Sequence, residues 1–176
     1  MKIAYTMMPG RGDMDRLLST LASDLIADGL RVCGVVQSNQ ERPGDHPCDM
    51  DIKVLPDGNE HRISQALGKG SRGCRLDPSV LEQAALEVEH SLEAGADILL
   101  INKYGKHEAQ GRGLATAIAM AVERDMPVIC GLNELNVEAF NTFTASAAVQ
   151  LAPKLNELVG WANTSLAGAV GDERVA

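Results

Sequence analysis

Apolar positions fall into short continuous runs separated by stretches with helical spacing. Residues 2–6 form an apolar run that ends in a Gly/Pro turn at residues 7–12. Apolar residues then recur at helical spacing over residues 14–28, and a second run follows at residues 31–37. A strand, a helix and a second strand in this order predict a parallel pair joined by a right-handed crossover.

The remaining pattern continues the alternation of strands and helices. Residues 49–55 and 60–65 flank Pro56-Asp57-Gly58-Asn59, a turn signal that predicts a β-hairpin. The continuous apolar run 97–102 is typical of a central parallel strand covered on both faces. Two more strands are expected at residues 127–131 and 147–151.

Capping residues mark the helix ends. Asp13 is the expected N-cap of the first helix and Gly29 its stop, while Asp77-Pro78 and Gly95 bound the second helix. The other expected helices lie around 114–122, at 136–143 and from Pro153 onward, and the expected loops are 38–48 and 66–76. The fold class is therefore α/β, with a mostly parallel sheet, helices on both faces and an inserted β-hairpin.

The composition of the chain limits the kinds of partner that it is expected to bind. The chain has 176 residues, 3% aromatics, and 16 Lys and Arg against 24 Asp and Glu, which gives a net charge of −8. This balance disfavours nucleic acid as the main partner, although a small anion needs only a local basic pocket. With no apolar leader, no run of membrane-spanning length and no Cys-x-x-Cys pair, we expect a cytoplasmic protein without membrane insertion.

Ligands of such sheets bind beyond the carboxyl ends of the strands, where residues 7–13, 103–108 and 131–136 are expected to lie. The first of these loops has the position of a phosphate-binding loop. A working P-loop ends in Gly-Lys-Ser/Thr. In this chain Asp13 stands at the position of the Lys, and Met14 stands at the position of the Ser or Thr hydroxyl. The alternative interpretation is that Asp13 only caps the helix.

Two motifs carry a family resemblance. Thr-x-x-Pro-Gly-x-Gly before a Leu-rich helix, and Ile-Asn-Lys-Tyr-Gly-Lys-His-Glu at residues 101–108, resemble the thermophile-type nucleoside-triphosphatase family of P-loop proteins. That family has Asp-Glu-x-Gly-x-x-Glu at the second place. Gly105 and Glu108 match this spacing, whereas Asn102 and Lys103 replace its first two acids.

Residues 101–113, together with 61–68 and 73–78, resemble more closely a bacterial domain-of-unknown-function family related to those phosphatases. The resemblance covers residues 2–160. It implies a P-loop-NTPase-like three-layer sandwich, which we place at residues 1–167, with a disordered tail at 168–176. Members of that family often lie beside molybdate-uptake genes, which implies a link to molybdenum or tungsten handling.

The departures from the motifs weaken the case for catalysis. Without the P-loop Lys, the metal-binding hydroxyl and the Walker B carboxylate, Mg²⁺-dependent hydrolysis is expected to be slow or absent, and no catalytic residue is assigned. Cations and amides in the same segments suit a tetrahedral dianion such as molybdate or tungstate, or a phosphorylated small molecule. The candidate ligand-binding residues are Gly10, Arg11, Gly12, Gln37, Arg62, Gln65, Arg72, Cys74, Arg75, Asn102, Lys103, Lys106, His107 and Arg112.

Two alternatives stay open at this point. One is a divergent nucleoside triphosphatase in which Arg11 and Lys103 replace the standard Lys. The other is an interaction or regulatory module without a ligand. The apolar stretch 140–151 is either core or the face of a homo-oligomer, and His46 and Cys48 have no second pair at zinc spacing.

Overall fold

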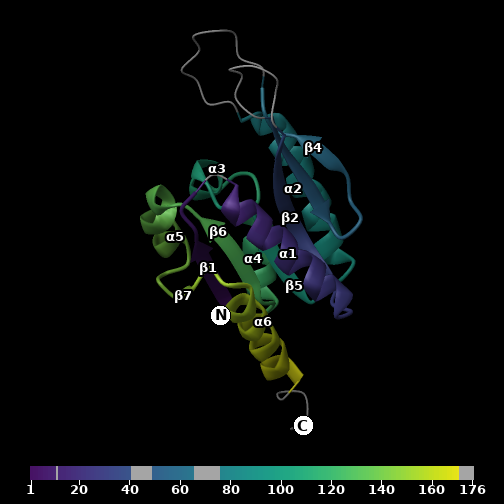
Figure 1. The fold of residues 1–176 in the computed structure, drawn as a ribbon, viewed down its shortest axis with the longest axis vertical. Helices are drawn as coiled ribbons and strands as arrows, with labels where there is room; N and C mark the ends of the chain where they lie inside the picture. Colours follow the sequence, from purple (N-terminus) through teal and green to yellow (C-terminus); the bar gives the residue numbers. More distant parts are fainter. Residues whose placement is uncertain (11, 41–48, 66–75, 171–176) are drawn as a thin grey trace.

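The computed structural model describes residues 1–10, 12–40, 49–65 and 76–170 (Figure 1). Within these residues, seven strands form one sheet in the order β4-β3-β2-β5-β6-β1-β7. Most strands begin in the apolar runs of the sequence because those runs are buried on both faces of the sheet. Their bounds are β1 Ile3–Met7, β2 Val32–Gln40, β3 Asp49–Leu55, β4 Glu60–Arg62, β5 Ile98–Ile101, β6 Val128–Leu132 and β7 Val149–Leu151.

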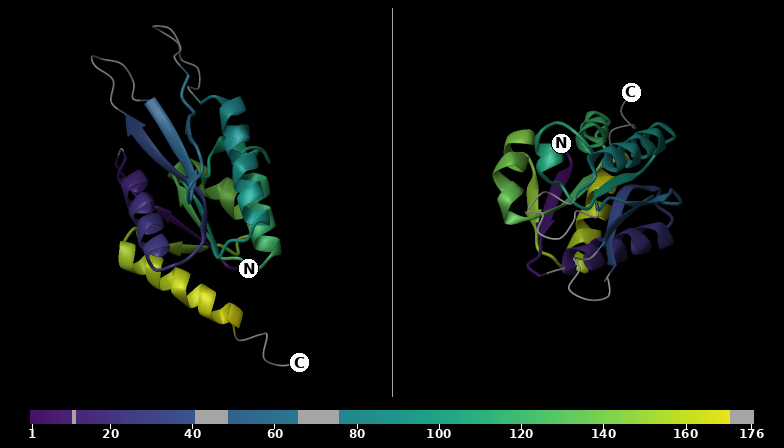
Figure 2. Two further views of the ribbon diagram at one scale, coloured as in Figure 1. Left: turned by 90° about the vertical axis from the view of Figure 1, so that its right-hand side faces the viewer. Right: turned by 90° about the horizontal axis from the view of Figure 1, so that it is seen from above.

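Helices cover both faces of the sheet, which gives the expected three-layer arrangement. Figure 2 shows α1 and α2 on opposite sides of the strands. One core lies between the sheet and α2 and α4, and a second lies between the sheet and α1 and α6. The helices are α1 Asp13–Ala27, α2 Pro78–Glu93, α3 Lys106–Ala109, α4 Ala115–Glu123, α5 Val137–Phe143 and α6 Leu155–Val170, with a 3₁₀ turn at Glu134–Asn136.

The sheet is mostly parallel, as predicted. Strands β2, β5, β6, β1 and β7 run parallel, and β3 and β4 add the antiparallel hairpin expected around Pro56–Asn59. The prediction that the first two strands form a pair is wrong, because β5 and β6 lie between β1 and β2. The connection through α1 therefore crosses over two other strands. The order strand, helix, strand in the sequence does not specify how many strands such a connection crosses.

Strand β2 has a glycine, Gly34, where its backbone lies beside Leu100 of the neighbouring strand β5. Gly34 has φ +118°, and a Cβ built there would collide with the backbone carbonyl oxygen of Leu100. Only glycine fits this position, both for its backbone conformation and for its space. The close contact fixes the two strands whose carboxyl ends carry the candidate site.

Several predicted boundaries are confirmed. Asp77 caps α2 by accepting the backbone N–H groups of Ser79 and Val80, and Gly29 and Gly95 have the positive φ of residues that end helices. Two other boundaries differ from the prediction. The expected loop at 38–48 starts later than predicted, because β2 continues to Gln40. Helix α6 continues to Val170, past the expected boundary at residue 167.

Candidate functional site

The loop between β1 and α1 has the position of a phosphate-binding loop but a different chemistry. Gly12, with φ +82°, is the N-cap residue of α1, so the prediction that Asp13 is the N-cap is wrong. Asp13 is instead the first helical residue and pairs with Arg16. A Cβ built on Gly10 would collide with Asp13 Oδ2. The Asp13 carboxylate therefore lies against the backbone of Gly10, in the loop that has the position of a phosphate-binding loop. Arg11 lies outside the described residues.

Met14, which stands at the position of the metal-binding hydroxyl of a P-loop, is part of the core. Met14 is 5% exposed and packs with Leu18 in the core beneath α1. Gly131 of β6 leaves the space for this contact, since a Cβ there would lie 2.8 Å from Leu18 Cδ1 and 3.3 Å from Met14 Cγ. A thioether in this position cannot ligate Mg²⁺.

Asp15 forms the polar centre that joins α1 to the ends of β2 and β5. Its side chain is 5% exposed. The Nδ2 atoms of Asn39 and Asn102 donate to its two carboxylate oxygens, the second at 3.2 Å, and Lys103 Nζ lies 3.2 Å from Oδ1. Gln37 extends the network, because its Nε2 donates to Asn39 Oδ1 at 3.1 Å. The arrangement compensates a buried carboxylate with one cation and two amides.

The network includes two residues that the sequence prediction missed, Asp15 and Asn39. Asp15 carries a usable signal, because it falls three positions before Leu18 on the buried face of an amphipathic helix, where an acid needs a partner. Asn39 carries no comparable signal in the sequence. Asn39 was expected in the loop at residues 38–48, but it lies near the end of the long strand β2.

A pocket of about 760 Å³ opens beside this network, at the carboxyl ends of β2 and β5; we call it the strand-end pocket. Its polar lining includes six of the predicted binding residues: Gln37, Asn102, Lys103, Lys106, His107 and Arg112. Its apolar lining consists of Val35, Met50, Ile52, Ile63, Leu76, Leu81 and Leu114. Gly10 and Gly12 do not line it, although one of its cations, Lys103, reaches the first turn of α1 through Asp15.

The segment that carries these cations is held by Glu108. Glu108 is 3% exposed and accepts the backbone N–H groups of Gly105 at 2.9 Å and Leu114 at 3.2 Å. Burial raises the pKa of this carboxyl, although both N–H groups oppose the shift. A Cβ on Gly113 would collide with Glu108 Oε1, which explains glycine there. The family motif's last Glu thus shapes the loop around the pocket.

Tyr104 anchors the same segment from the other side. Its ring packs edge-on against Phe140, with centroids 4.8 Å apart, and its backbone N–H donates to the Gly131 carbonyl at 3.0 Å. Phe140 is fully buried, whereas Phe143 is 39% exposed, so the stretch 140–151 is partly core. These contacts fix the backbone from which Lys103 and Lys106 project.

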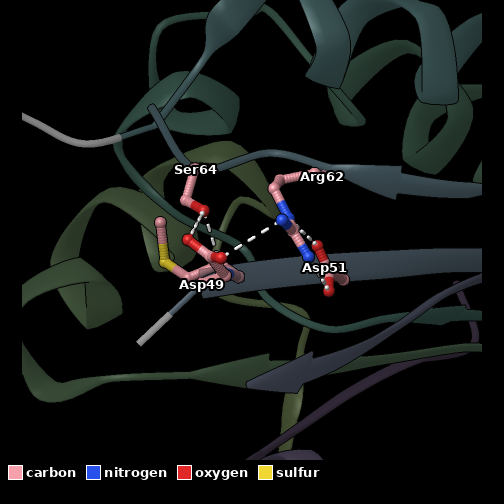
Figure 3. Close-up of polar contacts among 5 residues, drawn as sticks. Asp49, Asp51, Arg62 and Ser64 are labelled. Carbon is pink, nitrogen blue, oxygen red and sulfur yellow. Dashed lines mark hydrogen bonds and ion pairs between the residues drawn. The ribbon is translucent and has the colours of Figure 1, made fainter. Parts of the chain in front are cut away.

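Arg62 points away from the strand-end pocket. Figure 3 shows its guanidinium between Asp49 and Asp51, with Ser64 beside Asp49. Arg62 Nε lies 2.9 Å from Asp51 Oδ1, and Ser64 Oγ donates to Asp49 Oδ1 at 3.2 Å. These buried carboxylates raise the pKa of Arg62. The β3-β4 hairpin therefore uses Arg62 to compensate its own acids.

The remaining predicted residues fall into two groups. Gln65 Nε2 donates to the Leu76 carbonyl at 3.4 Å, so it braces the chain before α2. Arg72, Cys74 and Arg75 lie outside the described residues, as do His46 and Cys48. Within the described part of the chain no group of three or more His, Cys, Asp or Glu is placed to hold a metal ion.

The two described cysteines are core residues, as predicted. Cys33 and Cys130 are 2% and 0% exposed. Burial raises the pKa of the Cys33 thiol to about 11 and raises that of Cys130 as well. Both thiols therefore stay protonated and unreactive in the folded chain.

The chain is similar to a known protein family and to a curated protein. The family described as "Protein of unknown function (DUF2478)" matches residues 3–161. The chain belongs to this family. A curated relative, Molybdenum import ATP-binding protein ModC 2 of Bradyrhizobium diazoefficiens, is 32% identical over 160 residues. The match covers 91% of this chain but only 18% of that relative.

Two solved structures share the fold. A human cancer-related nucleoside triphosphatase matches with a TM-score of 0.60 at 18% identity, covering 99% of this chain and 100% of that one. THEP1 from the hyperthermophile Aquifex aeolicus matches with a TM-score of 0.60 at 15% identity, covering 93% and 96%. The P-loop-NTPase-like fold expected from the motifs is thereby confirmed. In the described residues, no helix has the length and apolarity needed to cross a membrane.

Proposed function

We propose that this chain is a binding domain for an anionic small molecule, held in the strand-end pocket, and that it hydrolyses nucleoside triphosphates slowly or not at all. The ligand is an oxyanion such as molybdate or tungstate, or a phosphorylated compound. The observation that carries the proposal is the distribution of charges: Asp13 lies against Gly10 in the loop between β1 and α1, while Lys103, Lys106 and Arg112 line the pocket.

The charges of the pocket support an anion as ligand. Among the described residues, Lys106 and Arg112 form no ion pair with a carboxylate, and Lys103 pairs only with Asp15. His107 adds a further ring nitrogen. Charge-assisted hydrogen bonds from such donors bind oxyanions more strongly than neutral ones. Arg112 offers the forked donors that fit a tetrahedral anion.

The same residues argue against efficient hydrolysis. Phosphoryl transfer needs a cation on the transferred phosphate and a carboxylate or hydroxyl on Mg²⁺. Here the helix start offers Asp13 and the buried Met14, and the strand end offers Asn102. We therefore infer that Mg²⁺ has no place in the function.

The link to molybdenum rests on the relative. Its name assigns molybdenum import and ATP binding to that protein, of which the matched segment is 18%. We propose that the domain supplies ligand binding in the handling of molybdenum or tungsten. The cationic lining gives this proposal a physical basis, since both metals travel as tetrahedral dianions.

Calorimetric titration tests the proposal, with molybdate, tungstate, ATP and GTP as ligands. We expect at least one to bind one-to-one, and Arg112→Ala to weaken that binding about fivefold or more, since it removes a charged donor. Lys154→Ala is the matched control: it removes one exposed cation outside the pocket and is expected to change nothing. Mg²⁺-dependent phosphate release from ATP or GTP, or equal binding by both variants, would contradict the proposal.

A further inference from the structure

Helix α5 carries an apolar surface at the edge of the molecule, and we propose that this surface docks a basic amphipathic helix of a partner protein (Figure 1). The surface consists of two hollows, of about 460 Å³ and about 230 Å³, on which Phe143 is the shared residue. We call it the α5 surface. Its apolar lining includes Ala109, Leu135, Ala139 and Phe143 in the larger hollow and Met1 and Val122 in the smaller one.

A stripe of apolar side chains runs along this part of the chain. The 3₁₀ turn Glu134–Asn136 leads directly into α5, so Leu135, Ala139 and Phe143 recur every fourth residue and lie along one side. Leu135 is 91% exposed and Phe143 39%, whereas Phe140 supplies the buried side of the helix. A single exposed apolar residue is ordinary, but a stripe of them beside adjoining hollows is typical of a protein interface.

The charges around the stripe define the partner. The charged side chains that line the two hollows are Glu123 and Glu138, both exposed. Neither forms an ion pair with a cation among the described residues. Glu134, also exposed, adds a third acid next to Leu135. An apolar stripe with an acidic rim fits a partner whose apolar side chains are flanked by Lys or Arg.

The same acids argue against a second copy of this chain as the occupant. In a two-fold contact each copy presents the same patch, so the acidic rims of both copies would meet. The net charge of −8 adds to this repulsion. A partner of opposite charge is favoured instead.

The dimensions of the stripe fit a helix. Leu135 and Phe143 are eight positions apart, which corresponds to about 12 Å along a helix axis. A partner helix of about three turns therefore covers both residues and places an apolar side chain in each hollow. A small molecule in one hollow would leave the other uncovered.

A protein occupant also agrees with the place of the α5 surface in the molecule. Ala109, the last residue of α3, lines this surface, while Lys106 and His107 of the same helix line the strand-end pocket. Phe143 packs on Tyr104, with ring centroids 5.7 Å apart. A docked partner would therefore contact the segment that carries the cations of the pocket. In the curated relative, the matched segment is 18% of a longer chain, so there it is joined to further protein segments.

Two synthetic helical peptides serve as probes. Both carry leucine at positions i, i+4, i+7 and i+11; one has lysine and the other glutamate at its polar positions. Titration of the fluorescently labelled peptides, followed by anisotropy, should show tenfold or tighter binding of the lysine peptide. Raising the salt concentration should weaken this binding.

Matched variants locate the peptide on the α5 surface. Leu135→Ser is expected to weaken binding of the lysine peptide at least fivefold, because a leucine is lost from the contact. Leu86→Ser is the control: Leu86 is a 55% exposed leucine of α2 that lines neither hollow. Glu138→Gln should weaken binding about twofold, and Glu157→Gln, which removes an exposed acid of α6, should change it less.

Equal binding of both peptides, or equal effects of Leu135→Ser and Leu86→Ser, would overturn the proposal. Sedimentation velocity of the protein alone tests the other occupant: a dimer that Leu135→Ser dissociates would assign the α5 surface to a second copy and would also overturn it. These results leave the proposed anion binding untouched, because Leu135 does not line the strand-end pocket. The titration of Arg112→Ala decides that question separately.

Discussion

Replacing Asp15 with Asn is expected to strengthen anion binding in the strand-end pocket while it lowers the stability of the fold. Asp15 neutralises Lys103 at 3.2 Å and sits on α1, whereas Lys103 also lines the pocket. An incoming anion therefore competes with Asp15 for the ammonium group. Asp15→Asn removes the competing charge but keeps an oxygen that can accept from Asn102.

The magnitude follows from geometry. Two charges 3.2 Å apart interact by about 1–3 kcal/mol when solvent screens them, as it does here because Lys103 is 37% exposed. Transferring about half of this to a bound anion gives a three- to tenfold gain in affinity. The lost charge-assisted bonds should cost about 1–2 kcal/mol of stability, which lowers the melting temperature by about 2–8 °C in a chain of this size.

The assay is a titration of the tightest-binding anion into the wild type, Asp15→Asn and Asp13→Asn, with thermal unfolding of each. Asp13→Asn removes the same charge from the same helical turn, but Asp13 pairs with Arg16 and not with Lys103. Only Asp15→Asn should raise affinity three- to tenfold. Unchanged or weaker binding by Asp15→Asn, or an equal gain in both variants, would refute the argument from Lys103.

Three further predictions concern stability. Gly34→Ala should cost more than about 3 kcal/mol in urea denaturation, since its Cβ would meet the Leu100 carbonyl; a wild-type midpoint would contradict the close packing. Asp77→Ala should cost about 1 kcal/mol through loss of the α2 cap, whereas Asp57→Ala in the exposed turn should cost less. Burial raises the pKa of Glu108, so the folded chain binds this proton more tightly than the unfolded chain does. The free energy of unfolding should therefore fall as pH rises from the ordinary carboxyl range through the raised pKa, and Glu108→Gln should lose that fall; parallel pH profiles of both proteins would contradict it.

Most of the fold was predictable because its elements carry local signals. The run at 97–102 has enough apolar residues to be buried on both faces, and β5 is the central strand that it predicts. Asp77-Pro78 encodes a cap and a first helical turn within two residues. Strand order was less accessible, because the crossover from β1 to β2 passes over β5 and β6, which come later in the chain.

The candidate site was only partly predictable, for a physical reason. Charge at the strand ends identified Lys103, Lys106 and Arg112, which the structure brings to one pocket. A single sequence does not tell which carboxylate a cation will meet. Arg62 pairs with Asp49 and Asp51 on its own hairpin, and those acids stand beside it only because β3 and β4 are in a particular register.

The most direct test of the central claim is an amide chemical-shift titration of the ¹⁵N-labelled protein with GMP and with molybdate. The claim is that this chain binds its ligand in the strand-end pocket, and not at the loop between β1 and α1, where a P-loop protein binds phosphate. It predicts that the shifts concentrate at residues 35–37 and 102–114, with residues 8–14 nearly unaffected. Shifts centred on residues 8–14 would contradict it, because the ligand would then occupy the loop against which Asp13 lies.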